Sequence, residues 1–200
     1  MTNFIGNDIV CLKTAARDSN WQRRGFLQKV FTDYEIRLIN ASKEKNQTVW
    51  RLWSMKEAAY KAYVQQTSET FFNPKKIQCQ FNCDKKGSAT INSNTYFVET
   101  SANFVYIHSI ASNSNHLSQD YQIVKFSDQF NTSKSYQIQS SETYQALLKF
   151  YAEKTNNSAD KLNVCKNKLG IPKLVVNNTI QREAVSISHH GCFGAFVITK

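Results

Sequence analysis

The segment RLWSMKEAAYKAY, residues 51–63, carries the charged side chains with the most informative spacing. Glu57 and Lys61 are four residues apart, so on a helix both lie on one face. A carboxylate one turn before a lysine is commonly a solvated ion pair that adds little to stability. Here Trp53 and Tyr60, with small residues between them, make the helix apolar or small on nearly every side. A charged pair on a buried helix needs a partner, and a metal ion or a phosphate would provide one.

An aspartate stands inside the apolar, strand-like segment GNDIV, residues 6–10. A lone aspartate in such a place is often a turn or cap residue. Asp8 and Glu57 together would instead suit Mg²⁺, which takes one or two carboxylates from a protein and completes its octahedron with waters and substrate phosphates. The two acids by themselves leave both interpretations open.

Near the C-terminus, the segment VSISHHG places hydroxyl groups and imidazoles at the end of a predicted strand. Ser186, Ser188 and His189 in this position can hold phosphate oxygens or a nucleotide sugar, although two surface histidines would give the same pattern. A serine hydrolase is not indicated, because the chain has no Gly-x-Ser-x-Gly elbow and Ser188 directly precedes His189. The chain also lacks a glycine-rich phosphate loop.

The charge balance predicts an anionic partner. Lys and Arg number 25 against 15 Asp and Glu, a net charge of +10, which favours nucleic acid, an acidic protein, a membrane surface or a polyphosphate. We expect no nucleic acid, because no basic stripe is interleaved with exposed aromatic residues, and no membrane, because no stretch reaches the roughly 18 apolar residues of a membrane span. The N-terminus has no signal-peptide pattern and the five cysteines are scattered, so we expect reduced thiols in a cytoplasmic protein.

The elements that would position these residues follow from periodicity and turn residues. We expect helices over 32–40, 48–66 and 142–154, and strands over 3–12, 77–81, 88–91, 95–100, 104–111, 121–126, 161–167, 173–176, 184–188 and 193–199. Thr32 and Glu35 form a capping-box pattern. Polar stretches at 112–118 and 127–141 predict a boundary. Since a helix and antiparallel strands occur on each side of it, we predict an α+β fold of two pseudo-duplicated halves, 1–118 and 119–200, each a helix packed on a small antiparallel sheet.

Five segments together resemble motifs of the 4′-phosphopantetheinyl transferase superfamily, which includes the holo-acyl-carrier-protein synthases and the surfactin-type enzymes. They are GNDIV (6–10), FLQKVFTDYEI (26–36), WSMKEAAYK (53–61), GIPKL (170–174) and SISHH (186–190). In surfactin-type members, the counterparts of GIPKL and SISHH lie in the first half and those of GNDIV and WSMKEAAYK in the second. The order is swapped here, so the chain resembles either the long form in swapped order or a short, trimer-type enzyme extended by its own partner half. The resemblance implies an active site at the interface between the two halves of one chain, and a monomer.

The resemblance also implies an activity and its residues. The reaction would be the Mg²⁺-dependent transfer of 4′-phosphopantetheine from coenzyme A to a serine of an acidic acyl or peptidyl carrier protein, in fatty acid biosynthesis or in polyketide or peptide synthesis, with release of adenosine 3′,5′-bisphosphate. By matched position, Asp8 and Glu57 would bind the metal ion, and Glu57 and Lys61 would be catalytic. Lys61, Ser188 and His189 would bind the coenzyme. The general base is either Glu57 or a bound water.

The chain departs from the family pattern at several positions, among them Val10, where surfactin-type members have a third acid. The departure at position 171 bears most directly on the coenzyme. Ile171 stands where the family has the lysine of its Gly-Lys-Pro segment, which removes an expected contact to the coenzyme. Lys168 or Lys173 would replace this lysine, and Lys173 is counted here among the coenzyme-binding residues. The alternative is a catalytically weakened family member that binds carrier protein or coenzyme A without transfer.

Overall fold

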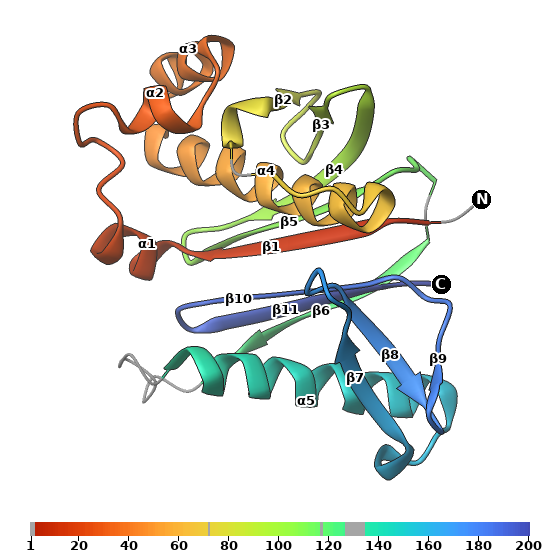
Figure 1. Ribbon diagram of the computed structural model, residues 1–200. Coiled ribbons are helices and arrows are strands. Elements are labelled where there is room, and N and C mark those ends of the chain that lie inside the picture. Colours follow the sequence, from red (N-terminus) through yellow and green to blue (C-terminus); the bar gives the residue numbers. More distant parts are fainter. Residues whose placement is uncertain (1–2, 72, 117, 127–134) are drawn as a thin grey trace.

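The computed structural model describes residues 3–71, 73–116, 118–126 and 135–200. It has the predicted α+β fold, in which helices pack on small antiparallel sheets (Figure 1). One sheet has five strands and two sheets have three strands each. The five-stranded sheet comes from the N-terminal part of the chain, and both smaller sheets come from the C-terminal part.

The five-stranded sheet carries a long helix across one face (Figure 1). Its strands are β1 (Ile5–Cys11), β2 (Ile77–Phe81), β3 (Lys86–Ile91), β4 (Asn94–Ala102) and β5 (Tyr106–Ser112), in the order β1-β5-β4-β3-β2. Its helices are α1 (Leu12–Asp18), α2 (Phe26–Val30), α3 (Asp33–Ala41) and α4 (Lys45–Thr67), with a 3₁₀ turn, η1 (Pro74–Lys76), before β2. The helices predicted over 32–40 and 48–66 are confirmed. The sequence pattern does not predict α1 and α2, because helices of 7 and 5 residues are too short to show a helical period.

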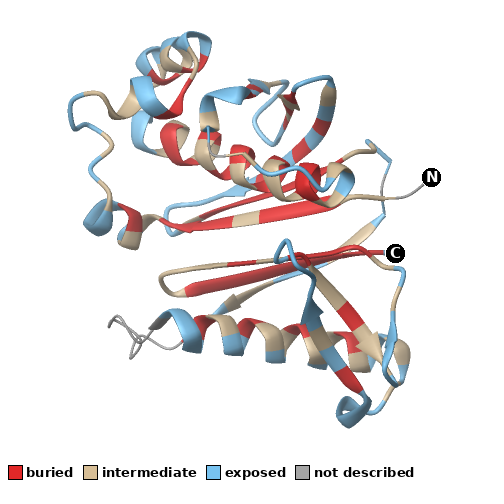
Figure 2. Ribbon diagram, viewed as in Figure 1, coloured by how far each residue is buried: buried red, intermediate tan, exposed pale blue. Residues whose placement is uncertain are grey.

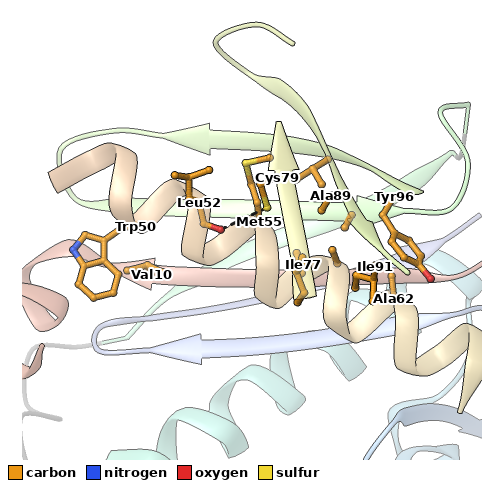
Figure 3. Close-up of a cluster of buried hydrophobic side chains, with 14 of the residues drawn as sticks. Val10, Trp50, Leu52, Met55, Ala62, Ile77, Cys79, Ala89, Ile91 and Tyr96 are labelled. Atoms are coloured by element: carbon orange, nitrogen blue, oxygen red, sulfur yellow. Dashed lines mark hydrogen bonds between the residues drawn. The ribbon is translucent and has the colours of Figure 1, made fainter. Parts of the chain in front are cut away.

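The main hydrophobic core lies between α4 and this sheet (Figure 3). Leu52, Met55 and Ala62 of α4 are fully buried, and they pack in one cluster with Ile77 and Tyr96 of the sheet. Fully burying a side chain of the size of leucine or methionine contributes roughly 1.5–3 kcal/mol. The helix is therefore held firmly on the sheet, and the positions of its charged residues are fixed by this packing.

One charged residue of α4 belongs to this core. Lys56 is fully buried, and its Nζ lies 2.8 Å from Oε2 of Glu35. The same ammonium donates hydrogen bonds to the carbonyl oxygens of Pro74 and Ile77. Glu35 is the acid of the predicted capping box, and its Oε2 also accepts a hydrogen bond from the Thr32 amide at 2.8 Å. The partner of this buried lysine is thus an acid on α3.

The C-terminal part of the chain forms the two smaller sheets. One contains β6 (Gln119–Lys125), β10 (Val185–His190) and β11 (Phe193–Thr199) in the order β10-β11-β6, and the other contains β7 (Leu162–Lys166), β8 (Pro172–Val176) and β9 (Thr179–Ile180). The helix α5 (Ser135–Thr155) packs on β10 and β11, and a 3₁₀ turn, η2 (Ala159–Lys161), precedes β7.

The prediction that this last helix begins at residue 142 was wrong, because α5 begins at Ser135. In its first turns the buried side chains are polar, namely Gln139 and Thr143. Without apolar residues at helical spacing, this stretch had the composition of a linker. Residues 127–134 of the predicted boundary stretch lie outside the described residues.

β1 and β10 run side by side where the two parts of the chain meet (Figure 1). β1 is mostly buried, and β10 is buried over half of its residues and partly buried over the rest (Figure 2). β1 is an edge strand of its sheet, and side chains of β10 satisfy its outer amides. The Asn7 amide donates to Oγ of Ser186 at 2.9 Å, and the Cys11 amide donates to Nδ1 of His190 at 2.9 Å. Because its free edge is covered in this way, β1 is fixed between the two parts of the chain.

Candidate active site between the two sheets

β1 and α4 approach each other closely at a glycine. A Cβ atom on Gly6 would lie 2.0 Å from the Ala58 carbonyl oxygen, so a larger residue would push the strand off the helix. Two residues further along the strand lies Asp8, and the Lys61 ammonium donates a hydrogen bond to the Asn7 carbonyl oxygen at 2.7 Å. The close contact therefore presents Asp8 to the face of α4 that carries Lys61.

The Asp8 carboxylate is fixed in this position, but one of its two oxygens has no hydrogen-bond partner among the described residues. Its side chain is 15% exposed, and Oδ1 lies 3.6 Å from Nζ of Lys61. Oδ2 is buried and is the oxygen without a partner in the described part of the chain. Burial raises the pKa of Asp8 to about 7; the Glu57 charge also raises it, whereas Lys61 lowers it. A buried carboxylate oxygen without a partner is a place where a cation would be stabilising.

Glu57 is the second carboxylate of the site. Burial raises its pKa, and within the described parts of the chain no hydrogen bond or ion pair holds it. The spacing of Glu57 and Lys61 allowed an ion pair, but their charged atoms do not come within 4 Å of each other. Lys61 pairs with Asp8 instead. Two carboxylates, one with a buried oxygen that lacks a partner and one that no described residue binds, fit a hard divalent cation such as Mg²⁺. The described residues hold no group of three or more metal-ligating side chains, so waters and a phosphorylated ligand would have to complete the coordination.

Two cavities meet at Asp8. The first, here called the wide cavity, has a volume of about 770 Å³, and its lining includes Phe26, Lys29, Trp53, Glu57 and Tyr60. The second, here called the polar pocket, has a volume of about 220 Å³, and its lining includes Lys61, Tyr144, Lys166 and Ser188. Asp8 and His189 line both cavities. The site thus joins a large, mostly apolar space with several aromatic residues to a small polar one that contains two lysines.

A hydrogen-bonded chain positions the hydroxyl of Ser188 in the polar pocket. Oγ of Ser188 is buried and accepts a hydrogen bond from Nδ2 of Asn7 at 3.0 Å. The same Asn7 nitrogen lies 3.3 Å from Nε2 of His108, and burial lowers the pKa of this histidine to about 4, so its ring is neutral at pH 7. Since Ser188 accepts from Asn7, its own hydroxyl proton remains available to donate to a ligand in the polar pocket.

His189 is held by the beginning of α5. Its Nδ1 lies 3.3 Å from Oε1 of Gln139, and its ring meets the ring of Tyr136 edge-on at a centroid distance of 4.6 Å. Burial lowers the pKa of His189 to about 4, and the charges of Lys61 and Lys166 lower it further. Two ammonium groups close to a neutral imidazole make this side of the pocket suitable for an anion.

The structure brings most of the predicted site residues together. Asp8, Glu57, Lys61, Ser188 and His189 all line the wide cavity or the polar pocket. Neither Lys168 nor Lys173 is among the residues that line these two cavities, and the assignment of Lys173 to the coenzyme stays a prediction.

Other residues of the site were missed from the sequence. Lys166, Tyr144 and Tyr136 carry no motif and are not near the other site residues in sequence, so only the fold reveals them. Asn7 stands inside GNDIV, next to Asp8. The position of this polar residue in an otherwise apolar strand was a signal that could have been used.

Comparisons with known proteins give a family and two structural neighbours. The model of the family described as the 4′-phosphopantetheinyl transferase superfamily matches residues 4–124, more than half of the chain. The holo-ACP-synthase from Plasmodium yoelii is similar over 56% of this chain and 95% of its own, with 18% identity and a TM-score of 0.42. The Thermotoga maritima holo-[acyl-carrier-protein] synthase (AcpS) is similar over 88% of this chain and 84% of its own, with 11% identity and a TM-score of 0.44. No curated protein matches the chain.

Proposed function

The chain belongs to the 4′-phosphopantetheinyl transferase superfamily, and we propose that it transfers the 4′-phosphopantetheine group of coenzyme A to a serine of an acyl or peptidyl carrier protein. In this reaction the serine oxygen forms a new bond to the β-phosphorus of the coenzyme. The bond between the β-phosphorus and the bridging oxygen breaks, and its electron pair leaves with adenosine 3′,5′-bisphosphate. The serine proton passes to a base.

The observation that carries this proposal is the position of Asp8, where the two cavities meet, together with Glu57 in the lining of the wide cavity. Mg²⁺ would be held by these two carboxylates, of which Asp8 has a buried oxygen without a partner in the described parts of the chain. Bound there, the ion would neutralise the negative charge that develops on the pyrophosphate. The fit rests on the donor set, since Mg²⁺ prefers carboxylate oxygens and accepts the remaining ligands from water and phosphate.

Other side chains would bind and orient the two substrates. Lys61, which reaches Asp8, would contact the phosphates, and Ser188 and His189 in the polar pocket would hold the nucleotide end of the coenzyme. The mostly apolar wide cavity would take the pantetheine arm and admit the carrier serine. Glu57, whose carboxylate is not engaged by another described residue, would accept the serine proton.

The carrier protein would be an acidic partner. A chain with a net charge of +10 attracts a negatively charged protein and raises its rate of association. We further propose that residues 1–118 and 119–200 act as the two halves of one site, so that a monomer in the cytoplasm is active. In the part of the chain that the structure describes, no helix is long and apolar enough to cross a membrane.

Release of adenosine 3′,5′-bisphosphate from coenzyme A tests the proposal. The protein is incubated with an apo acyl carrier protein, coenzyme A and Mg²⁺, and the nucleotide is quantified by chromatography. Release is expected to require the carrier and Mg²⁺ and to fall by roughly 100-fold or more in Glu57→Gln. The matched control is Glu99→Gln, an exposed acid on β4, which is expected to leave the rate unchanged.

The alternative is a family member that has lost transfer. It predicts no release with any carrier tested, although coenzyme A still binds in calorimetry. The substitution that suggested this alternative, Ile171, is buried and packs with the cluster around α4. The isoleucine therefore has a packing role, and its presence alone is no sign of lost activity.

A further inference from the structure

The polar pocket contains a lysine that belongs to none of the sequence motifs. Lys166 is the last residue of β7, and it lines the pocket together with Lys61, Ser188 and His189. Its Nζ lies 5.7 Å from the ring centroid of Tyr144 on α5. Among the described residues, no carboxylate lies within ion-pair distance of this ammonium group. Lys166 is therefore an exposed lysine in the lining of the pocket, and its charge is available to a ligand.

Lys61, the other lysine of the pocket, has partners of its own. It donates to the Asn7 carbonyl oxygen at 2.7 Å and lies 3.6 Å from Oδ1 of Asp8, so it belongs to the carboxylate end of the site. Lys166 instead packs near Tyr144, and its charge acts on His189. The two ammonium groups thus serve two ends of one pocket.

Position 171 does not supply a charge to this pocket. The Ile171 side chain is 9% exposed and packs into the hydrophobic cluster around α4. Lys168 and Lys173, the replacements considered from the sequence, are not among the residues that line the pocket. Of the lysines in this region of the chain, Lys166 is the one that the fold brings to Ser188 and His189.

We propose that Lys166 binds the phosphomonoester on the ribose of the coenzyme and makes the protein distinguish coenzyme A from dephospho-coenzyme A. This inference rests on the proposed function. A phosphomonoester between Lys166, His189 and the Ser188 hydroxyl would meet a full positive charge and a hydroxyl donor. The pyrophosphate of the same molecule would lie at the Asp8 end, where Lys61 is held.

Binding of two nucleotides tests the assignment without carrier protein or transfer. Adenosine 3′,5′-bisphosphate and adenosine 5′-monophosphate are titrated by calorimetry into the wild-type protein and into Lys166→Met. The wild type is expected to bind the bisphosphate more tightly. Lys166→Met is expected to lose about tenfold or more of this affinity, because a hydrogen bond to a charged group is lost, and to bind the monophosphate as before. Lys149→Met, which removes an exposed lysine of α5, is the matched control and is expected to change neither affinity.

The outcomes separate this inference from the proposed function. Two results, each obtained while transfer occurs, would show that the assignment of Lys166 is wrong and leave the proposed function standing. In the first, Lys166→Met still prefers the bisphosphate as strongly as the wild type does. In the second, the preference is lost in Lys168→Met or Lys173→Met instead. If the wild type binds neither nucleotide and transfers nothing, both are wrong. In transfer assays, support for the assignment is a rise of about tenfold in the KM for coenzyme A in Lys166→Met, with the KM for dephospho-coenzyme A unchanged.

Discussion

The burial of Asp8 in the site destabilises the folded protein. Asp8 is a mostly buried carboxylate with one oxygen that no described residue satisfies, and burial raises its pKa from 3.8 to about 7. At neutral pH the folded protein therefore contains a carboxylate that ionises less readily than in the unfolded chain. Such costs are typical of functional positions, where a ligand rather than the protein supplies the missing partner.

Without metal, Asp8→Asn is expected to be more stable than the wild type, by an amount that grows as the pH rises. Below about pH 4 the wild-type aspartate is protonated in both states, so the variant gains nothing. Between 3.8 and about 7 the unfolded state is ionised while the folded state keeps its proton, so wild-type stability falls as the pH rises. The asparagine does not titrate. Above about pH 7 the variant is therefore expected to be more stable by up to about 4 kcal/mol, from about three pH units at about 1.4 kcal/mol each.

Urea unfolding at several pH values measures this difference. Asp84→Asn, which changes an exposed aspartate in the turn between β2 and β3, is the control and is expected to follow the wild type. With Mg²⁺ present, the wild type but not Asp8→Asn is expected to gain stability, because the ion binds the folded state. A variant that is no more stable than the wild type at high pH would contradict the description of Asp8 as unsatisfied.

At the scale of the elements, adjacent residues of α4 have opposite roles. Lys56 lies in the core and pairs with Glu35 of α3, while Glu57 faces the wide cavity. The sequence predicted that charges on this buried helix need a partner. It did not predict that the partner of Lys56 is the acid of a capping box more than 20 residues earlier, since this contact depends on how α3 packs.

Lys56→Met is expected to destabilise the protein by about 3–5 kcal/mol, because it leaves the Glu35 carboxylate buried without its counter-charge. The double variant Lys56→Met with Glu35→Gln is expected to recover part of this loss. Denaturant unfolding of the two single variants and the double variant measures the coupling. Additive losses would show that the two residues do not act as a pair.

Much of the fold was predictable from the sequence, and the reasons differ between elements. The meander over 77–111 and the helix α4 have clear periods and turn residues, and they were found. The start of α5 was missed because its buried face is polar, at Gln139 and Thr143. The motifs supplied Asp8, Glu57, Lys61, Ser188 and His189, but the position of Lys166 in the pocket depends on the packing of β7 near α5, which no local pattern contains.

At the scale of the whole molecule, the site depends on both parts of the chain. β1 brings Asp8, α4 brings Glu57 and Lys61, and β10 brings Ser188 and His189. The contacts between β1 and β10 join the two parts through side chains, as in the hydrogen bond from the Asn7 amide to Ser186. All the residues assigned to the site come from one chain, as the proposed monomer requires.

The net charge of +10 leads to a prediction about the carrier protein. The KM for an acidic carrier is expected to rise about tenfold from low to high ionic strength, while kcat changes little, because salt screens the attraction between the two proteins before the chemical step. Steady-state kinetics at increasing NaCl concentration measures both constants. A KM that is insensitive to salt would mean that the carrier is not recognised through charge.

Intact-mass spectrometry of the carrier tests whether Asp8 and Glu57 support phosphopantetheinyl transfer. An apo acyl carrier protein is incubated with this protein, coenzyme A and Mg²⁺. The carrier is expected to gain the mass of one phosphopantetheine. EDTA, Asp8→Asn or Glu57→Gln is expected to abolish this gain while the variants remain folded. A gain that persists in both variants, or a wild-type protein that neither modifies any carrier nor binds coenzyme A, would contradict this proposal.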